Sequence, residues 1–92
     1  MAHAIAYDLT PQVSVSMHQY GAVFFHMEHG RLFAVNQTGA DIWRGLAERH
    51  SAEHIAEDLC RTYRISLEKA RTHTGRFIAQ LEGQQLIAQR LG

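Results

Sequence analysis

The chain has 92 residues, 46% hydrophobic and 20% charged, and its nine Lys and Arg balance nine Asp and Glu at a pI of about 7.1. This length suits one small domain with a single core, which argues against a large catalytic cavity. The balanced charge gives no strong field to attract a nucleic-acid backbone, and no apolar run reaches the ~20 residues of a membrane span. We therefore expect a globular cytoplasmic protein with neither a nucleic-acid nor a membrane partner.

The first 12 residues show no sustained hydrophobic period. They contain the only proline, Pro11, whose fixed φ and missing N–H discourage regular structure. The sequence therefore predicts a flexible N-terminal arm over residues 1–12 and one domain over residues 13–92.

Three short strands are predicted after this arm. Residues 13–18 alternate between apolar and polar side chains, which is the period of a half-buried strand. A turn at Tyr20 and Gly21 leads into residues 22–28, which are rich in aromatic and β-branched types, and residues 31–35 follow at hairpin spacing. We expect an antiparallel three-stranded sheet.

The hydrophobic period then changes from two to 3.6, which indicates helices. Thr38 can cap a first helix at about residues 39–49, and Ser51 and Ser66 can cap a second and a third in the same way. Gly83 is placed to end the third helix, and Leu86 and Ile87 form a short extended tail. The predicted order is βββααα, an α+β fold similar to a winged helix-turn-helix.

Seven histidines raise the question of a metal site. His26 and His29 share one hairpin, while His50 and His54 lie on either side of the Ser51 cap. No acid or thiol completes a familiar ligand set, and the motif H-E-x-x-H is absent. We expect surface histidines and no metal.

Nothing in the sequence demands catalysis. The carboxylates and tyrosines show no paired acid/base spacing, and no base is placed to activate the single cysteine, Cys60. One cysteine cannot form an internal disulfide, which fits a reducing compartment. We expect a non-enzyme without a cofactor, in which Cys60 is a small, partly buried thiol.

A DNA-binding regulator is the main alternative, because the second and third helices have the tight connection of a helix-turn-helix. The third helix carries basic residues, but it also carries acidic ones and a central glycine that weakens it as a recognition helix. These residues are Lys69, Arg71, Arg76, Glu68, Glu82 and Gly75. A solvated helix face explains the charges equally well.

The strand at residues 31–35 suggests a different role. It carries one charge and no proline, so its edge has little protection against pairing with another chain. If the third helix packs beside it, the groove between them would accept an extended peptide as a fourth strand. Cover by the N-terminal arm, or by a second copy in a homodimer, remains the alternative.

Residues 30–46 resemble the central signature of the PqqD family, in which a strand ends in Asn, a Thr-Gly-Ala turn follows, and a helix opens with Ile-Trp. The resemblance continues through the second helix at residues 51–59 and the closing run at residues 77–87. Two positions differ: His73 stands where the family usually has an acid, and Gln85 where it has a small residue.

The resemblance implies a non-catalytic module, a RiPP recognition element, that binds the leader segment of a ribosomally made precursor peptide and presents it to a modifying enzyme. That enzyme would be a radical-SAM protein or a leader peptidase. The leader is expected between the third strand and the third helix. Mapped onto this chain, the implied contacts are the backbone of Arg31, Leu32, Phe33, Ala34 and Val35, and the side of the third helix bearing Ala70, Arg71, Thr74, Gly75 and Ile78. Arg71 would pair with acidic leader residues, and Gly75 would allow close approach.

Overall fold

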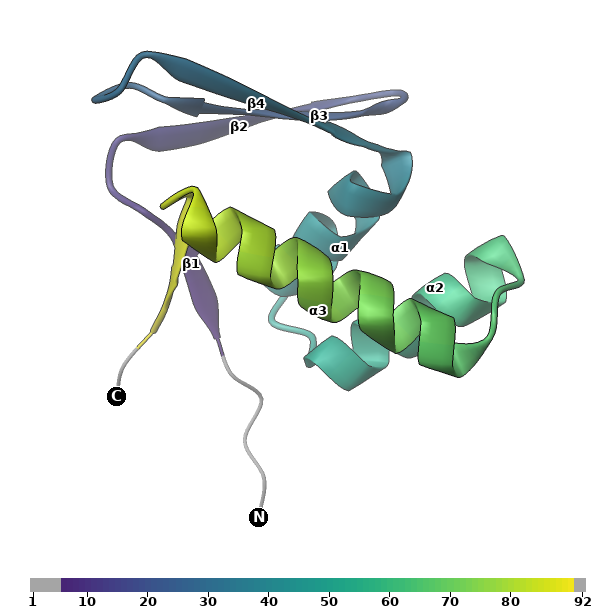
Figure 1. The fold of residues 1–92 in the computed structure, drawn as a ribbon. Coiled ribbons are helices and arrows are strands. Elements are labelled where there is room, and N and C mark those ends of the chain that lie inside the picture. The colour runs from purple at the N-terminus through teal and green to yellow at the C-terminus, as the bar shows by residue number, and fades with distance from the viewer. Residues whose placement is uncertain (1–5, 91–92) are drawn as a thin grey trace.

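A computed structural model describes residues 6–90. Three helices lie on one face of a three-stranded antiparallel sheet, and a separate pair of short strands joins the two ends of the described chain (Figure 1). The elements are β1 (Tyr7–Leu9), β2 (Val13–His18), β3 (Gly21–His26), β4 (Arg31–Asn36), α1 (Gln37–Ala47), α2 (Ala52–Tyr63), α3 (Leu67–Gly83) and β5 (Ile87–Gln89). The order βββααα is confirmed for residues 13–83.

The sheet is a meander in the order β2-β3-β4. Val13 pairs with His26 across β2 and β3, and His26 pairs in turn with Arg31 on β4. The side chains of β3 that face the helices are almost fully buried, whereas Phe25, on the outer face, remains exposed. One face of the sheet therefore packs on the core and the other meets solvent.

A polar side chain caps each helix at its start. The oxygens of Asn36, Ser51 and Ser66 accept hydrogen bonds from the N–H groups three residues later. The predicted caps of α2 and α3 are confirmed. The prediction for α1 was two residues late at both ends: Asn36 caps the helix instead of Thr38, because the last residue of β4 is already extended and its side chain reaches the N–H of Gly39.

The core lies between the sheet and the helices. Phe24 of β3 is fully buried and meets Trp43 of α1 edge to face, with ring centroids 5.6 Å apart. Leu59 of α2 and Leu81 of α3 close the core from the other side. Helix α1 therefore connects the sheet to the α2–α3 pair.

The segment predicted as a flexible arm is in part a strand. Residues 7–9 form β1 and pair antiparallel with β5, and Tyr7 and Leu9 pack against the core. Periodicity could not reveal a three-residue strand whose partner lies about 80 residues later. Residues 1–5 lie outside the described part of the chain. The predicted tail at Leu86 and Ile87 does pack back, since both side chains are buried.

Within the described residues, no helix has the length and apolar character needed to cross a membrane.

Candidate functional site

Strand β4 is an edge of the sheet. It pairs with β3 on one side, and no strand among residues 6–90 pairs with its other side. In an antiparallel sheet, successive residues of an edge strand point their backbone N–H and C=O groups alternately toward the neighbouring strand and away from it. The register therefore determines which residues of β4 offer free hydrogen-bonding groups.

A hydrogen bond just beyond the ends of β2 and β3, next to the β3–β4 turn, shows which residues of β3 face β2. The N–H of Met27 donates to the carbonyl oxygen of Gln12 at 2.9 Å, so the odd-numbered residues of β3 direct their backbone groups toward β2. The even-numbered residues 22, 24 and 26 then face β4, where their register partners are residues 35, 33 and 31.

The outward-facing residues of β4 are therefore Leu32 and Ala34. The carbonyl group of Val35 supports this assignment, because it points toward β3. Its oxygen would lie only 2.1 Å from a Cβ built on Gly21. Leu32 and Ala34 together present two N–H donors and two C=O acceptors along the free edge.

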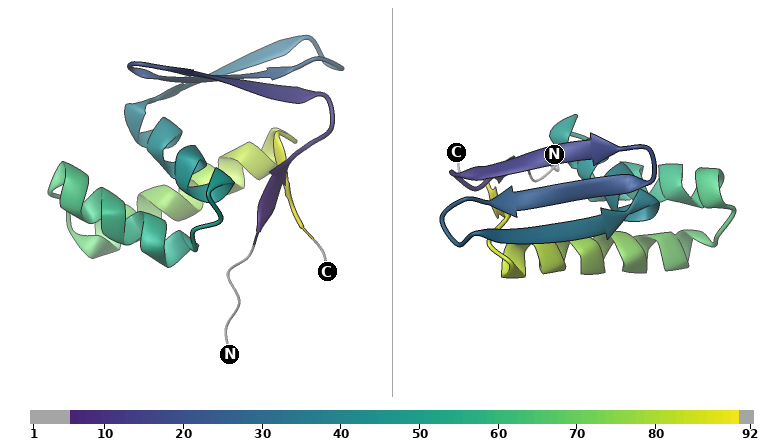
Figure 2. Two further views of the ribbon diagram at one scale, coloured as in Figure 1. Left: turned by 180° about the vertical axis from the view of Figure 1, so that it is seen from behind. Right: turned by 90° about the horizontal axis from the view of Figure 1, so that it is seen from above.

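Helix α3 runs alongside this edge, as the right-hand view of Figure 2 shows. Two hollows, of 450 Å³ and 390 Å³, lie between α3 and the ends of β4. The larger contains Asn36, Gly39, Ile42, Tyr63 and Phe77 in its wall; the smaller contains His26, Arg31, Phe33, Gln84 and Leu86. Gln80 lines both, and we call the two hollows together the β4–α3 groove.

The two arginines that line the β4–α3 groove make it positively charged. Arg31 lines one end and Arg76 the other, and neither hollow has a carboxylate in its wall. Within the described chain, neither arginine forms an ion pair. The groove therefore favours an acidic occupant.

The sequence-derived contacts on β4 divide between two faces of the sheet. Phe33 and Val35 are half-buried and pack against the core, whereas Leu32 is 70% exposed. Arg31 and Ala34 are also exposed and line the smaller hollow with Leu32 and Phe33. Val35 lines neither hollow.

The contacts expected on α3 do not line the groove, and this expectation is corrected. Ala70, Thr74 and Ile78 are buried in the core. Arg71 and Gly75 border a different hollow, on the side of α2. The rotation of α3 explains the difference: residues 70, 74, 78 and 81 form its buried stripe, and the adjacent stripe, His73, Arg76, Phe77, Gln80 and Gln84, faces β4.

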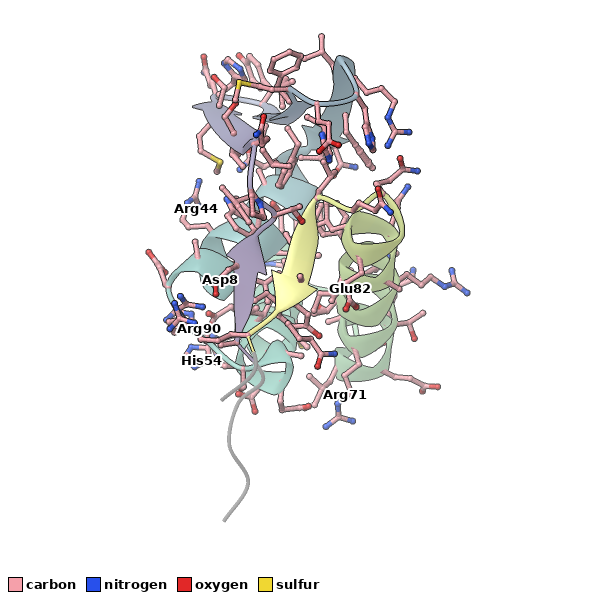
Figure 3. The ribbon with its side chains drawn as sticks, turned by 90° about the vertical axis from the view of Figure 1, so that its left-hand side faces the viewer. Asp8, Arg44, His54, Arg71, Glu82 and Arg90 are labelled. Carbon is pink, nitrogen blue, oxygen red and sulfur yellow. The ribbon has the colours of Figure 1, made fainter. Side chains whose placement is uncertain are left out.

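Arg71 forms an ion pair with Glu53 of α2. Its Nε donates to the carboxylate of Glu53 at 2.7 Å, and this hydrogen bond lowers the pKa of Glu53. Figure 3 shows Arg71 at the end of α3 distant from the sheet. Both side chains of the pair are about half exposed, so the pair adds little to stability.

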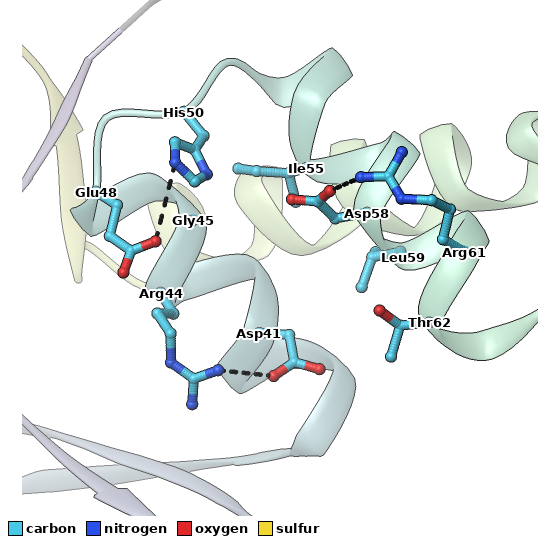
Figure 4. A pocket seen from close by; sticks show the side chains of 10 residues that line it. All are labelled: Asp41, Arg44, Gly45, Glu48, His50, Ile55, Asp58, Leu59, Arg61 and Thr62. Atoms are coloured by element: carbon cyan, nitrogen blue, oxygen red, sulfur yellow. Dashed lines mark hydrogen bonds and ion pairs between the residues drawn. The ribbon is translucent and has the colours of Figure 1, made fainter.

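A third hollow, of 370 Å³, lies between α1 and α2 (Figure 4). Two arginine–carboxylate pairs border it, Asp41 with Arg44 and Asp58 with Arg61, and Glu48 lies 3.9 Å from His50. Asp41 also accepts a hydrogen bond from the hydroxyl of Tyr63, whose pKa is raised by burial and by this carboxylate. The hollow is more polar than the larger hollow of the β4–α3 groove and has no strand edge beside it.

His50 and His54 come together despite the Ser51 cap between them. Their rings stack with centroids 4.3 Å apart, and Asp58 stands one turn after His54 on α2. The ligand atoms of these three residues all lie within 4.8 Å of one another. Asp58 therefore lies beside the two histidines, although the sequence analysis identified no acid that would complete a ligand set. The sequence did contain evidence for this cluster: Asp58 follows His54 by four residues, which places both side chains on one face of a helix.

Comparison with solved structures finds the same fold in two leader-peptide complexes. One is a lasso peptide synthetase B1 complexed with the leader peptide, with 24% sequence identity and a TM-score of 0.84, covering 89% of this chain and 96% of that chain. The other is TbiB1 in complex with the TbiA(beta) leader peptide, with 20% identity and a TM-score of 0.81, covering 92% of this chain and 99% of that one. Such identities establish similarity of fold.

A comparison with curated proteins found no significant match. The family model described as coenzyme PQQ synthesis protein D (PqqD) matches residues 21–87, from β3 to the start of β5. This match covers the sheet edge, α3 and the groove between them. The chain therefore belongs to the PqqD family.

Proposed function

We propose that this protein is a non-catalytic leader-peptide chaperone. It binds the leader segment of a ribosomally synthesised precursor as an added strand in the β4–α3 groove and delivers it to a modifying enzyme, such as a radical-SAM protein or a leader peptidase. The observation that carries this proposal is the free backbone edge at Leu32 and Ala34 beside α3. The fold shared with two proteins solved as leader-peptide complexes supports it.

The bound segment is extended and pairs its backbone with Leu32 and Ala34. Strand addition supplies affinity through main-chain hydrogen bonds, while pockets beside the edge select side chains. The larger hollow, walled by Ile42 and Phe77, accepts an apolar side chain. Arg31 and Arg76, one at each end, attract acidic residues of the leader.

Residue-resolved amide exchange by NMR tests this placement. The probe is a synthetic peptide whose sequence comes from the leader region of the short reading frame nearest the gene. In the free protein we expect the amides of Leu32 and Ala34 to exchange quickly and those of Phe33 and Val35, which face β3, to be protected. Saturating peptide is expected to protect Leu32 and Ala34 specifically. Tight peptide binding with no change at these two amides would overturn the strand-addition proposal.

Two further measurements separate the alternatives. In a homodimer paired through this edge, Leu32 and Ala34 would already be protected at high protein concentration without peptide, and the protection would fall on dilution. Fluorescence anisotropy with random duplex DNA tests the regulator alternative. Salt-sensitive binding of duplex, without peptide binding, would favour that function instead.

A further inference from the structure

The α1–α2 corner carries a set of side chains that the proposed function does not use. His50 lies in the loop after α1, and His54 and Asp58 lie one turn apart on α2. None of the three lines the β4–α3 groove. Imidazole nitrogens with a carboxylate oxygen are a ligand set typical of zinc and the neighbouring divalent transition metals.

From this cluster we infer that His50, His54 and Asp58 form a binding site for a divalent transition-metal ion of the zinc class. Magnesium and calcium are disfavoured, because they prefer all-oxygen ligands. Three protein ligands leave a fourth position of a tetrahedral ion open. A water molecule can fill this position.

The backbone already holds the two histidines close together. The N–H of His50 donates to the carbonyl oxygen of Gly45 at 2.9 Å, and the N–H of His54 donates to the Ser51 hydroxyl at 3.0 Å. These bonds fix the chain on both sides of the cap. The ligand atoms, now within 4.8 Å of one another, must close to about 3.3 Å around a tetrahedral zinc ion. Because all three side chains are at least a third exposed, rotation of their χ angles can achieve this.

The two oxygens of Asp58 already face different partners. Oδ2 lies 3.3 Å from Nε2 of His54, while Oδ1 accepts a hydrogen bond from Arg61 (Figure 4 shows the Arg61 contact). A metal ion can therefore take Oδ2 while Arg61 keeps its bond to Oδ1 and orients the carboxylate. The hollow beside the cluster is lined by three carboxylates, Asp41, Glu48 and Asp58, and by two arginines, Arg44 and Arg61.

The hairpin pair, His26 and His29, is not a comparable site. Its rings stack with centroids 4.1 Å apart, but His26 is 3% exposed, and within residues 6–90 only the His50 cluster brings three metal-ligating side chains together. This pair lacks an accessible third ligand.

Titration of the untagged full chain with Co²⁺ alone, followed by its visible absorption, tests the site, and Zn²⁺ is then used to displace the cobalt. We expect one ion per chain with micromolar affinity and an absorption of tetrahedral or five-coordinate intensity. His54→Ala and Asp58→Asn should each weaken binding at least about tenfold. His73→Ala, which alters a histidine of the β4–α3 groove, is the matched control and should leave Co²⁺ binding unchanged.

The inference is overturned if binding is only millimolar, or if His54→Ala and Asp58→Asn bind Co²⁺ as tightly as the unaltered chain. Circular dichroism verifies that both variants are folded, and they keep the N-cap oxygen of Ser51. The result is independent of the leader-peptide proposal, because peptide binding is measured separately on the same variants without metal.

Discussion

Phe77 of α3 packs directly over Gly39 in the first turn of α1. A Cβ built on Gly39 would lie 2.8 Å from Cε1 of the Phe77 ring and 3.2 Å from Cβ of Val35. The glycine of the Thr-Gly-Ala turn thus lets α3 approach the end of β4. The same ring forms part of the wall of the larger hollow, so this contact sets the shape of the β4–α3 groove.

Gly39→Ala should both destabilise the protein and weaken peptide binding. The new methyl group forces the Phe77 ring to move, and such overpacking costs about 1–3 kcal/mol, partly offset by up to about 1 kcal/mol from the better helix propensity of Ala. We expect a net loss of about 1 kcal/mol in urea denaturation and a several-fold weaker Kd for the leader peptide. The double variant Gly39→Ala/Phe77→Leu should recover stability. Wild-type stability and affinity in Gly39→Ala would show that the ring does not define the groove.

Gly75→Ala should have the opposite effect on stability and no effect on the peptide. Gly75 lies in the middle of α3, and a Cβ there would have no heavy atom within 4 Å. Replacing an unhindered helical glycine with alanine stabilises by about 0.5–1 kcal/mol, which corresponds to a rise in Tm of a few degrees. Leader binding is the second measurement. A loss of affinity would show that the peptide passes along the α2 side of α3, beside the predicted contacts Arg71 and Gly75.

Most of the fold could be predicted from the sequence because local patterns specify it. The alternation at residues 13–18, the hairpin spacing before Arg31 and the serine caps of α2 and α3 depend only on neighbouring residues. The pairing of β1 with β5 could not be predicted, because a three-residue strand has no detectable period and its partner lies at the other end of the chain.

The geometry around the candidate site was predicted only in part, for a similar physical reason. The unprotected edge of β4 follows from composition, and hollows do lie between this strand and α3, the two elements that the sequence indicated. Which face of α3 borders it depends on the rotation of the helix about its axis, and a shift of one residue changes the direction of a side chain by about 100°. The sequence therefore predicted contacts at Thr74 and Ile78, which are buried, in place of Phe77 and Gln80, which line the groove.

Neutralising one arginine on each side of α3 shows which side of this helix the peptide occupies. Arg76→Gln removes a groove cation without an ion-pair partner among residues 6–90, and it should weaken binding of an acidic leader peptide about two- to fivefold at low salt. The difference should shrink as salt rises. Arg71→Gln is the matched change on the α2 side and should alter the affinity less than twofold, because Arg71 pairs with Glu53. A larger loss for Arg71→Gln than for Arg76→Gln would contradict the proposed groove.

Asp8 connects the strand pair β1–β5 to the α1–α2 loop, and its contribution should depend on pH. Its carboxylate accepts hydrogen bonds from Arg49 at 2.7 Å and from Arg90 at 2.9 Å, and these contacts lower its pKa below the usual value of 3.8, with the Arg49 bond as the largest cause. Figure 3 shows Asp8 of β1 close to Arg90, the residue that follows β5. A lowered pKa means that the stabilisation is complete above the unfolded-state value and is lost as the pH falls through the folded-state value.

Asp8→Asn should therefore lower Tm at pH 7, by less than about 5 °C for so exposed a cluster, and the two proteins should converge in Tm as the pH falls well below 3.8. Thermal melts of both proteins from pH 7 down to well below pH 3.8 check whether the difference in Tm shrinks as the pH falls. Glu28→Gln is a suitable control, because Glu28 is exposed in the β3–β4 turn and forms no ion pair within the described chain. If the Tm difference between Asp8→Asn and the unaltered chain is the same at both ends of the pH range, the carboxylate charge does not hold the strand pair in place. The packing of Tyr7 and Leu9 against the core would then account for its position.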